Sequence, residues 1–214
     1  MIDARRGEAA TEDPLEQATK EFSGELSGET ALPLIVRPSA ESDVPAMLAI
    51  YEHHIRHGQS DLDAEFMAPD PLRDDDIKRR RKNMLRRRLP HLVADRGGTV
   101  VGYAYAVPFR KRPAYRYAVK HSIYVHPGHL HSGIGRALLP MLVEACTQEG
   151  FRQMFAYIDA TNVASRKLHE AFGFRLVGVL EGVGLKFGRW TDTVLMQRAL
   201  GPGASEPPAY SRTT

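Results

Sequence analysis

The segment from Ile123 to Ala145 constrains the fold of this chain more than any other. It opens with an alternating apolar run that ends at His126, continues through a short polar loop with three glycines, and closes with apolar residues at helical spacing. This pattern predicts a strand, a glycine loop and a helix. The N-terminus of such a helix directs several backbone N–H groups outward, and its dipole favours negative charge. We therefore expect the loop to hold a phosphate or diphosphate group.

The spacing of the glycines narrows the choice of ligand. A Rossmann fingerprint would need a small residue at Leu138, and a Walker loop would need a lysine at Arg136. The window from Leu130 to Gly135 instead resembles the acyl-CoA loop of the GNAT N-acetyltransferase superfamily, whose signature is Gln/Arg-x-x-Gly-x-Gly/Ala. Both glycines match, and Leu130 replaces the leading Gln or Arg. A plain glycine turn between a strand and a helix would show the same pair of glycines.

A second segment, Asn162 to Phe174, resembles the other cofactor segment of this superfamily. It places an asparagine at the end of a predicted strand, then a helix, then a Gly-Phe pair. Spacings of three and four put Asn162, Ser165 and His169 on one stripe of that helix. A core helix would not favour three polar side chains on its stripe, so the pattern supports the cofactor interpretation.

Four further stretches resemble the phosphinothricin N-acetyltransferase branch of the superfamily. They are Tyr103–Ala106, Phe109–Arg116, Ser122–Val125 and Gly184–Asp192. They fall in the family's order, and the whole likeness covers residues 35–200. The resemblance implies transfer of an acetyl group from acetyl-CoA to the α-amino group of a small amino acid or analogue, such as phosphinothricin or methionine sulfoximine. It also implies a homodimer.

The resemblance assigns acetyl-CoA, as a co-substrate, to a defined set of residues. These are Ile123, Tyr124, Val125, His131, Ser132, Gly133, Ile134, Gly135, Arg136, Asn162 and Ser165. Acetyl transfer needs a deprotonated amine, donors for the carbonyl oxyanion and a proton for the leaving thiolate. Backbone N–H groups along Val125 and the preceding strand are candidates for the oxyanion. His169 stands where many members keep a tyrosine acid, so it is the candidate proton donor to the thiolate, although a lone helical histidine can also be structural.

The general base departs from the family pattern. The branch usually reads Val-Glu-x-Ser/Thr-Val-Tyr-Val before the loop, and its glutamate is held to deprotonate the amine; here Lys120 replaces it. A lysine ammonium is charged at neutral pH and accepts no proton unless burial deprotonates it. His121 is chemically better suited, but strand alternation directs it to the face opposite Lys120. The candidate catalytic residues are therefore His169, His121 and Lys120.

Three functional hypotheses follow from this replacement. In the first, His121 or an ordered water replaces the glutamate, and Lys120 attracts an acidic group of the acceptor. In the second, the chain acetylates another small amine. In the third, it binds acyl-CoA with impaired catalysis, since Leu130 and Lys120 both depart from the family. The resemblance places Arg112, Tyr115 and Lys120 near the acceptor, with a guanidinium suited to a carboxylate or phosphinate.

Length and composition predict one folded domain with two tails. The 214 residues, 43% of them hydrophobic, can bury one full core. Residues 1–33 are predicted to be a disordered acidic tail, because Met1 to Thr30 carries eight acidic and three basic residues and few large apolar ones. Residues 34–200 form the predicted GNAT domain, and 201–214 a flexible tail. The expected fold is α/β, with a mixed, mostly antiparallel sheet of about seven strands and helices on both faces.

The local patterns predict individual elements. Strands are expected at 34–38, 91–95, 99–109, 118–125, 152–159, 174–180 and 191–200, and helices after Asp43, over 74–89, after the glycine loop and over 163–172. The helix over 74–89 places Ile77, Leu85 and Leu89 on one stripe and covers the remainder with basic residues.

Charge and cysteine content limit the partners. A net charge of +3 does not require a nucleic-acid partner, and the basic helix has no interleaved aromatic residues, so a solvated face is the simpler interpretation. No hydrophobic run predicts a signal or membrane segment. The single cysteine, Cys146, allows no intrachain disulfide and is expected to be a packing residue in a reducing interior. We therefore expect a cytoplasmic protein that acts on a small molecule.

Two groups of histidines raise the question of a metal. His53, His54 and His57 crowd the end of one helix, and His126, His129 and His131 follow the predicted strand. Neither group has a nearby carboxylate or cysteine pattern. We interpret the first group as a solvated helix end and the second as loop histidines beside a diphosphate. No metal site is predicted.

Overall fold

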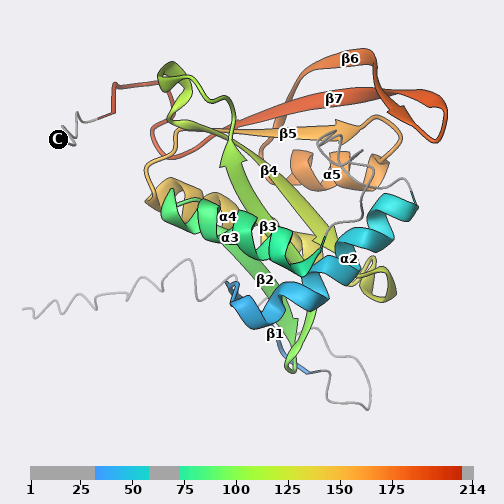
Figure 1. Cartoon of the computed structure of the whole chain (residues 1–214). Helices are drawn as coiled ribbons and strands as arrows, with labels where there is room; N and C mark the ends of the chain where they lie inside the picture. Colours follow the sequence, from blue (N-terminus) through green and yellow to red (C-terminus); the bar gives the residue numbers. More distant parts are fainter. Residues whose placement is uncertain (1–31, 58–72, 209–214) are drawn as a thin grey trace, which may run out of the picture. The chain divides into compact units, whose positions relative to one another are not determined.

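The computed structural model describes residues 32–57 and 73–208 (Figure 1). The compact unit begins at Pro33. Nearly all of the predicted acidic tail lies outside the described residues, as do the last six residues. Residues 201–208 form turns after the final strand, and Gly203 is buried among them. The tail boundaries at 33 and 201 stay predictions.

Seven strands form one sheet in the order β1-β2-β3-β4-β5-β7-β6 (Figure 1). They are β1 (Leu34–Pro38), β2 (His91–Arg96), β3 (Thr99–Pro108), β4 (Ala118–Val125), β5 (Gln153–Asp159), β6 (Arg175–Lys186) and β7 (Arg189–Ala199). Each neighbouring pair in this order is antiparallel except β4–β5. The predicted mixed, mostly antiparallel seven-stranded sheet is confirmed.

Among the described residues, four α-helices pack against the sheet: α2 (Val44–Arg56), α3 (Asp74–Arg86), α4 (Ile134–Gln148) and α5 (Val163–Ala171). Tyr124 of β4 joins the cluster buried under α2, whereas Val119 of the same strand joins the cluster buried under α4. Even and odd residues of a strand point to opposite faces, so these helices cover opposite faces of the sheet. α5 lies on the α4 side, where His169 contacts His121.

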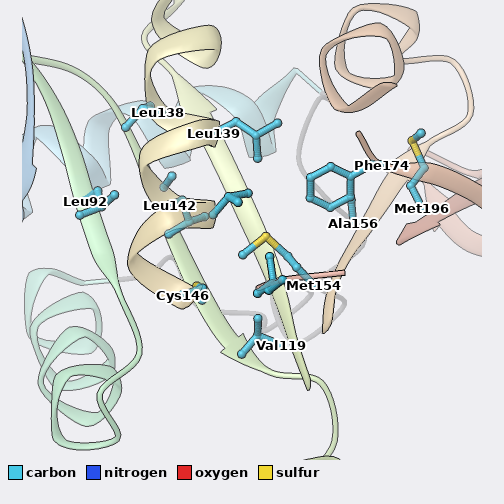
Figure 2. Packing of buried hydrophobic residues seen from close by; sticks show 14 of the residues in the cluster. Leu92, Val119, Leu138, Leu139, Leu142, Cys146, Met154, Ala156, Phe174 and Met196 are labelled. Atoms are coloured by element: carbon cyan, nitrogen blue, oxygen red, sulfur yellow. The ribbon is translucent and has the colours of Figure 1, made fainter. Parts of the chain in front are cut away.

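The larger core lies between α4 and the central strands (Figure 2). Leu138, Leu142 and Cys146 of α4 are fully buried, together with Met154 of β5. Burial raises the pKa of the Cys146 thiol to about 12, because a thiolate there would lose its hydration. Cys146 is therefore a packing residue, as predicted.

Helix α3 is shorter than the pattern predicted and faces the core differently. Leu89 is buried beyond its C-terminus, while Leu85 is 42% exposed and Met84 packs on the core. The interval of eight residues between Ile77 and Leu85 therefore did not define the buried stripe. The helix ends at Arg86, and Arg88 adopts a positive φ of 56°, which takes the chain out of the helical path.

The last two strands are longer than predicted and form one hairpin. They meet at Phe187 and Gly188, whose φ angles of 47° and 75° are those of a tight turn in which both central residues are left-handed. Phenylalanine rarely adopts this conformation, so the residue types did not predict a turn at this position. The hairpin exposes many large apolar side chains: Leu176, Val177, Val179, Leu180, Val183, Leu185, Phe187 and Trp190.

A glycine in β3 lets α4 approach the sheet, and this contact is testable. A Cβ on Gly102 would lie 2.7 Å from Cγ2 of Ile134 and 3.0 Å from the Tyr124 carbonyl oxygen. We expect Gly102→Ala to lower the free energy of unfolding by about 1–3 kcal/mol, the usual cost of overpacking a core. Urea denaturation of the purified variant measures this change.

Gly178→Ala in β6 is the matched control. A Cβ on Gly178 meets no atom within 4 Å. Its stability should stay within about 0.5 kcal/mol of the parent protein, as for most surface changes. Equal destabilisation by the two variants would contradict the packing explanation.

Candidate functional site

Strand β4 loses its neighbour half-way along its length. It pairs with β5 only through Ala118, Val119 and Lys120, and the two strands then part (Figure 1). The rest of β4, from His121 to Val125, keeps its pairing with β3 on the other side. One edge of this half-strand is therefore not covered by β5.

The ladder fixes which backbone groups face that open edge. The carbonyl of Ala118 accepts from the Phe109 N–H, and the His126 N–H donates to the Val101 carbonyl, so even-numbered residues of β4 bond to β3. The carbonyl of Tyr117 accepts from the Arg152 N–H beside β5. Backbone groups alternate in direction along a strand. The odd-numbered residues His121, Ile123 and Val125 thus direct their N–H and C=O groups toward the open edge.

One of these groups has a partner from another element. His54 of α2 is buried, and its Nε2–H donates to the Val125 carbonyl oxygen over 2.7 Å. Burial lowers the pKa of His54, which keeps the imidazole neutral. His54 supplies at the end of β4 a hydrogen bond that a neighbouring strand would otherwise supply. The Ile123 and Val125 N–H groups still face the open edge.

The interpretation of the three helix-end histidines was therefore wrong for His54. His53 and His57 stack with ring centroids 4.1 Å apart, and His57 is exposed, but His54 is part of the protein interior. The sequence held a usable signal, because His54 follows Met47, Ile50 and Tyr51 at helical spacing on the buried stripe.

The glycine loop is placed where the sequence predicted it, directly after the open half of β4. His131 and Ser132 are exposed, and Gly133 begins α4 as its N-cap with a φ of 80°. Ile134 is buried and anchors the helix. The amides of residues 131–136 therefore lie at an accessible helix N-terminus, the arrangement that binds anions.

Gly135 is needed for the packing of two helices as well as for access of a ligand to the loop. A Cβ on Gly135 would lie 3.0 Å from Leu168 of α5, so this glycine also lets the two helices approach. Arg136 is exposed and lies over the ring of Phe172 at 5.7 Å, which again links α4 to the end of α5. The two segments that resembled cofactor segments are thus neighbours.

The second segment is ordered by its own polar residues. The Asn162 side-chain oxygen accepts from the Ser165 N–H over 3.0 Å and caps α5. The Ser165 carbonyl accepts from Nδ1–H of His169 over 2.7 Å. The predicted stripe of Asn162, Ser165 and His169 is present, and its last member is buried.

His169 meets His121 across the site. Their Nε2 atoms are 3.2 Å apart and their rings are stacked, with centroids 5.1 Å apart. Burial lowers the pKa of His121 well below its ordinary value, and the neighbouring His169 lowers it further; burial also lowers the pKa of His169. Two of the three candidate catalytic residues therefore form one buried, neutral pair.

A small cavity lies beside this pair, at the point where the strands part. It has a volume of about 20 Å³ and is lined by residues of β4, β5 and α5. They are His121, Ser122, Ile123, Ala156, Tyr157, Ile158, Ser165 and His169.

Lys120 points to the other face of the sheet, as strand alternation predicted. Its register partners are Val107 of β3 and Phe155 of β5. Phe155 stacks on Phe109 with centroids 4.3 Å apart, and Phe109 meets Tyr115 edge-on at 5.7 Å. Lys120 therefore lies beside an aromatic group that includes one predicted acceptor residue.

Two of the predicted acceptor residues, Tyr115 and Arg112, lie on the surface. Tyr115 is 41% exposed and belongs to the aromatic group. Arg112 precedes the short turn Pro113–Tyr115 and is exposed. Within residues 32–57 and 73–208, no three His, Cys, Asp or Glu side chains are placed to hold a metal ion.

Comparison with known proteins points to one family. Residues 55–174 match the model of the acetyltransferase (GNAT) family. The chain is 44% identical over 174 residues to a phosphinothricin N-acetyltransferase of Alcaligenes faecalis, covering 81% of this chain and 86% of that protein. It is 34% identical over 176 residues to an L-methionine sulfoximine/L-methionine sulfone acetyltransferase of Pseudomonas aeruginosa, covering 80% and 98%.

A solved structure agrees with this result. The phosphinothricin acetyltransferase of Sinorhizobium meliloti, crystallised with acetyl-CoA, superposes with a TM-score of 0.77 at 38% identity, covering 83% of this chain and 94% of that one. In the described part of this chain, every helix is too short or too polar to span a bilayer.

The left-handed start of α4 gives a test of the anion-binding loop. Gly133→Ala places a methyl group beside the helix N-terminus and strains a φ of 80°. We expect the affinity for acetyl-CoA to fall about tenfold, equivalent to about 1.4 kcal/mol. Isothermal titration calorimetry of the purified protein with acetyl-CoA measures this loss.

Gly150→Ala is the control at the opposite end of the same helix. Gly150 has a φ of 83°, and a Cβ there meets no atom within 4 Å. Its backbone strain is comparable, so its thermal stability should fall similarly while acetyl-CoA affinity stays unchanged. Equal loss of affinity in both variants would mean that strain, not the loop, sets binding.

Proposed function

Since the chain belongs to the acetyltransferase (GNAT) family, we propose that it transfers the acetyl group of acetyl-CoA to the amino group of a small amino acid or analogue, of the phosphinothricin or methionine sulfoximine type. The open edge of β4 beside an accessible helix N-terminus is the observation that carries this proposal. The β4 edge offers backbone donors for the amide-bearing arm of the coenzyme, and the adjacent helix N-terminus offers donors for its diphosphate.

The coenzyme residues divide into three groups. Amides of residues 131–136 bind the diphosphate at the start of α4. The backbone of β4 from Ile123 to Val125 bonds to the extended arm, as an added strand would. Asn162 and Ser165 order the first turn of α5 beside it.

The small cavity limits where the thioester lies. Its volume of about 20 Å³ has room for one water molecule, not for an acyl thioester. The arm therefore runs along the edge of β4, and the thioester carbonyl meets the outward N–H groups at the mouth of the gap. Those donors stabilise the oxyanion that forms when the amine attacks.

The acceptor approaches from the face that carries Lys120. The ammonium of Lys120 attracts an acidic group of the acceptor, and the rings of Phe155, Phe109 and Tyr115 bound the same surface. Arg112 lies in the loop next to Tyr115 and offers a guanidinium to a carboxylate or phosphinate. Because Lys120 replaces the family glutamate, transfer to a different small amine is the second candidate function.

Two properties complete the proposal. The apolar side chains exposed along β6 and β7, including Phe187 at 72% and Trp190 at 70%, form a surface of the kind that protein interfaces bury. A second copy of this chain covers it, giving a homodimer. The protein works in the cytoplasm, where a single buried thiol and an acetyl-CoA co-substrate are in keeping with a reducing compartment.

A thiol-release assay tests the proposed function. The purified chain is mixed with acetyl-CoA and a panel of amines that includes phosphinothricin, methionine sulfoximine and simple amino acids. We expect acceptor-dependent release of CoA with at least one amine. Calorimetry with acetyl-CoA accompanies the assay: binding without release for any amine would indicate an acyl-CoA-binding protein, and no binding would contradict the proposal entirely.

Charge reversal at Lys120 tests the acceptor side separately. If Lys120 adapts the site to an acceptor other than phosphinothricin, Lys120→Glu should accelerate acetylation of phosphinothricin about tenfold, since the change restores the family glutamate at this position. Lys82→Glu, the same change at an exposed position on α3, should leave the rate unchanged. A slower Lys120→Glu enzyme would show that Lys120 suits phosphinothricin itself.

A further inference from the structure

The hydrogen bonds of the histidine pair determine where its protons lie. The Ser165 carbonyl can only accept, so the bond of 2.7 Å places a proton on Nδ1 of His169. In the neutral imidazole, Nε2 of His169 then carries a lone pair. The contact of 3.2 Å must therefore be a bond in which Nε2–H of His121 donates to Nε2 of His169.

This arrangement leaves Nδ1 of His121 as an acceptor. Nδ1 is buried, and it has no hydrogen-bond partner among the described residues. His121 also lines the cavity between the parting strands. A buried acceptor without a partner is costly and needs an explanation, such as a ligand or water that is bound in use.

His169 is less available for proton exchange with a substrate. Its Nδ1–H is held by Ser165 and its Nε2 by His121, so both nitrogens are engaged within the protein. The same side chain stacks against His121 and meets Phe174 edge-on at 5.0 Å, which restricts rotation of the ring.

We infer that Nδ1 of His121 is the group that exchanges the proton with the reactants, and that His169 is a positioning residue that fixes the tautomer of His121. The inference deepens the proposed function and rests on it. It also gives the site a base that does not need the glutamate that Lys120 replaces.

One nitrogen serves both proton steps. As the amine nitrogen bonds to the carbonyl carbon at the gap between β4 and β5, that nitrogen gives its proton to Nδ1 of His121 through one water in the cavity, since His121 lies on the face opposite Lys120. As the carbon–sulfur bond breaks, the imidazolium returns the proton from Nδ1 to the CoA sulfur. The products are the N-acetyl amide and the free thiol, and His121 is neutral again.

His169 supports the intermediate state of this cycle. When His121 is protonated, its Nε2–H remains bonded to the lone pair of His169, which spreads the positive charge over two rings. The carbonyl of Ser165 accepts from the far end of the pair. A partner that cannot accept at this point would leave Nε2–H of His121 unbonded, so the tautomer with a lone pair on Nδ1 would no longer be held by a hydrogen bond.

Steady-state kinetics with the best acceptor of the panel test these roles. His121→Phe keeps an aromatic ring for stacking but removes both ring nitrogens. It should lower kcat about 10²- to 10⁴-fold with little change in KM for acetyl-CoA. His169→Gln can accept from His121 and donate to Ser165, and should keep kcat within about tenfold, whereas His169→Phe cannot accept and should lose clearly more than His169→Gln. Melting temperatures of all three variants show which of them fold.

Two kinetic outcomes would overturn the inference. If His169→Gln were as inactive as His169→Phe while folded, His169 itself would be the reacting group. If His121→Phe kept its kcat, another base would serve the site. Either result would leave acetyl transfer by the parent protein intact, so it is distinguishable from failure of the proposed function.

Nitrogen-15 NMR of histidine-labelled protein tests the tautomers without any acceptor. At neutral pH the free protein should show His121 protonated at Nε2 and His169 protonated at Nδ1, and the His121 Nε2–H signal should shift in His169→Phe, because its acceptor is lost. His121 protonated at Nδ1 in the parent protein would contradict the inference whether or not an acceptor is found.

Discussion

The site depends on the early end of the pairing between β4 and β5. Both strands start side by side, but only three residue pairs join them before they part. An unpaired strand edge inside a sheet leaves backbone groups that need partners. Here β3 pairs with β4 along its whole length, so β4 is held in place while its other edge stays open. This open edge is a suitable surface for the extended arm of a ligand.

The polar groups around this gap find hydrogen-bond partners from different elements. His54 satisfies the Val125 carbonyl from α2, and the histidine pair fills the α5 side with groups that bond to each other. Burial keeps these imidazoles neutral, so they supply hydrogen bonds without placing charge in the core. The amides of Ile123 and Val125 are thereby left facing the gap, and the aromatic group around Lys120 bounds the other face.

Much of the fold could be read from the sequence because its local signals agree with the global structure. Alternation around the Gly97-Gly98 turn predicted β2 and β3, and the strand–glycine–helix pattern placed Gly133 at a helix start. The hairpin turn at Phe187 was missed because that residue adopts a φ its type disfavours. The contact of His121 with His169 joins residues 48 positions apart, and periodicity within one element carries no information about such a pairing.

Amide hydrogen exchange of the protein with and without acetyl-CoA tests the central claim most directly. The account predicts new protection at Ile123 and Val125 and across residues 131–136, with the amides of the β6–β7 hairpin unchanged. Saturating acetyl-CoA that protects other segments and leaves the Ile123 and Val125 amides exchanging as before would contradict the assignment of the open β4 edge as the coenzyme site.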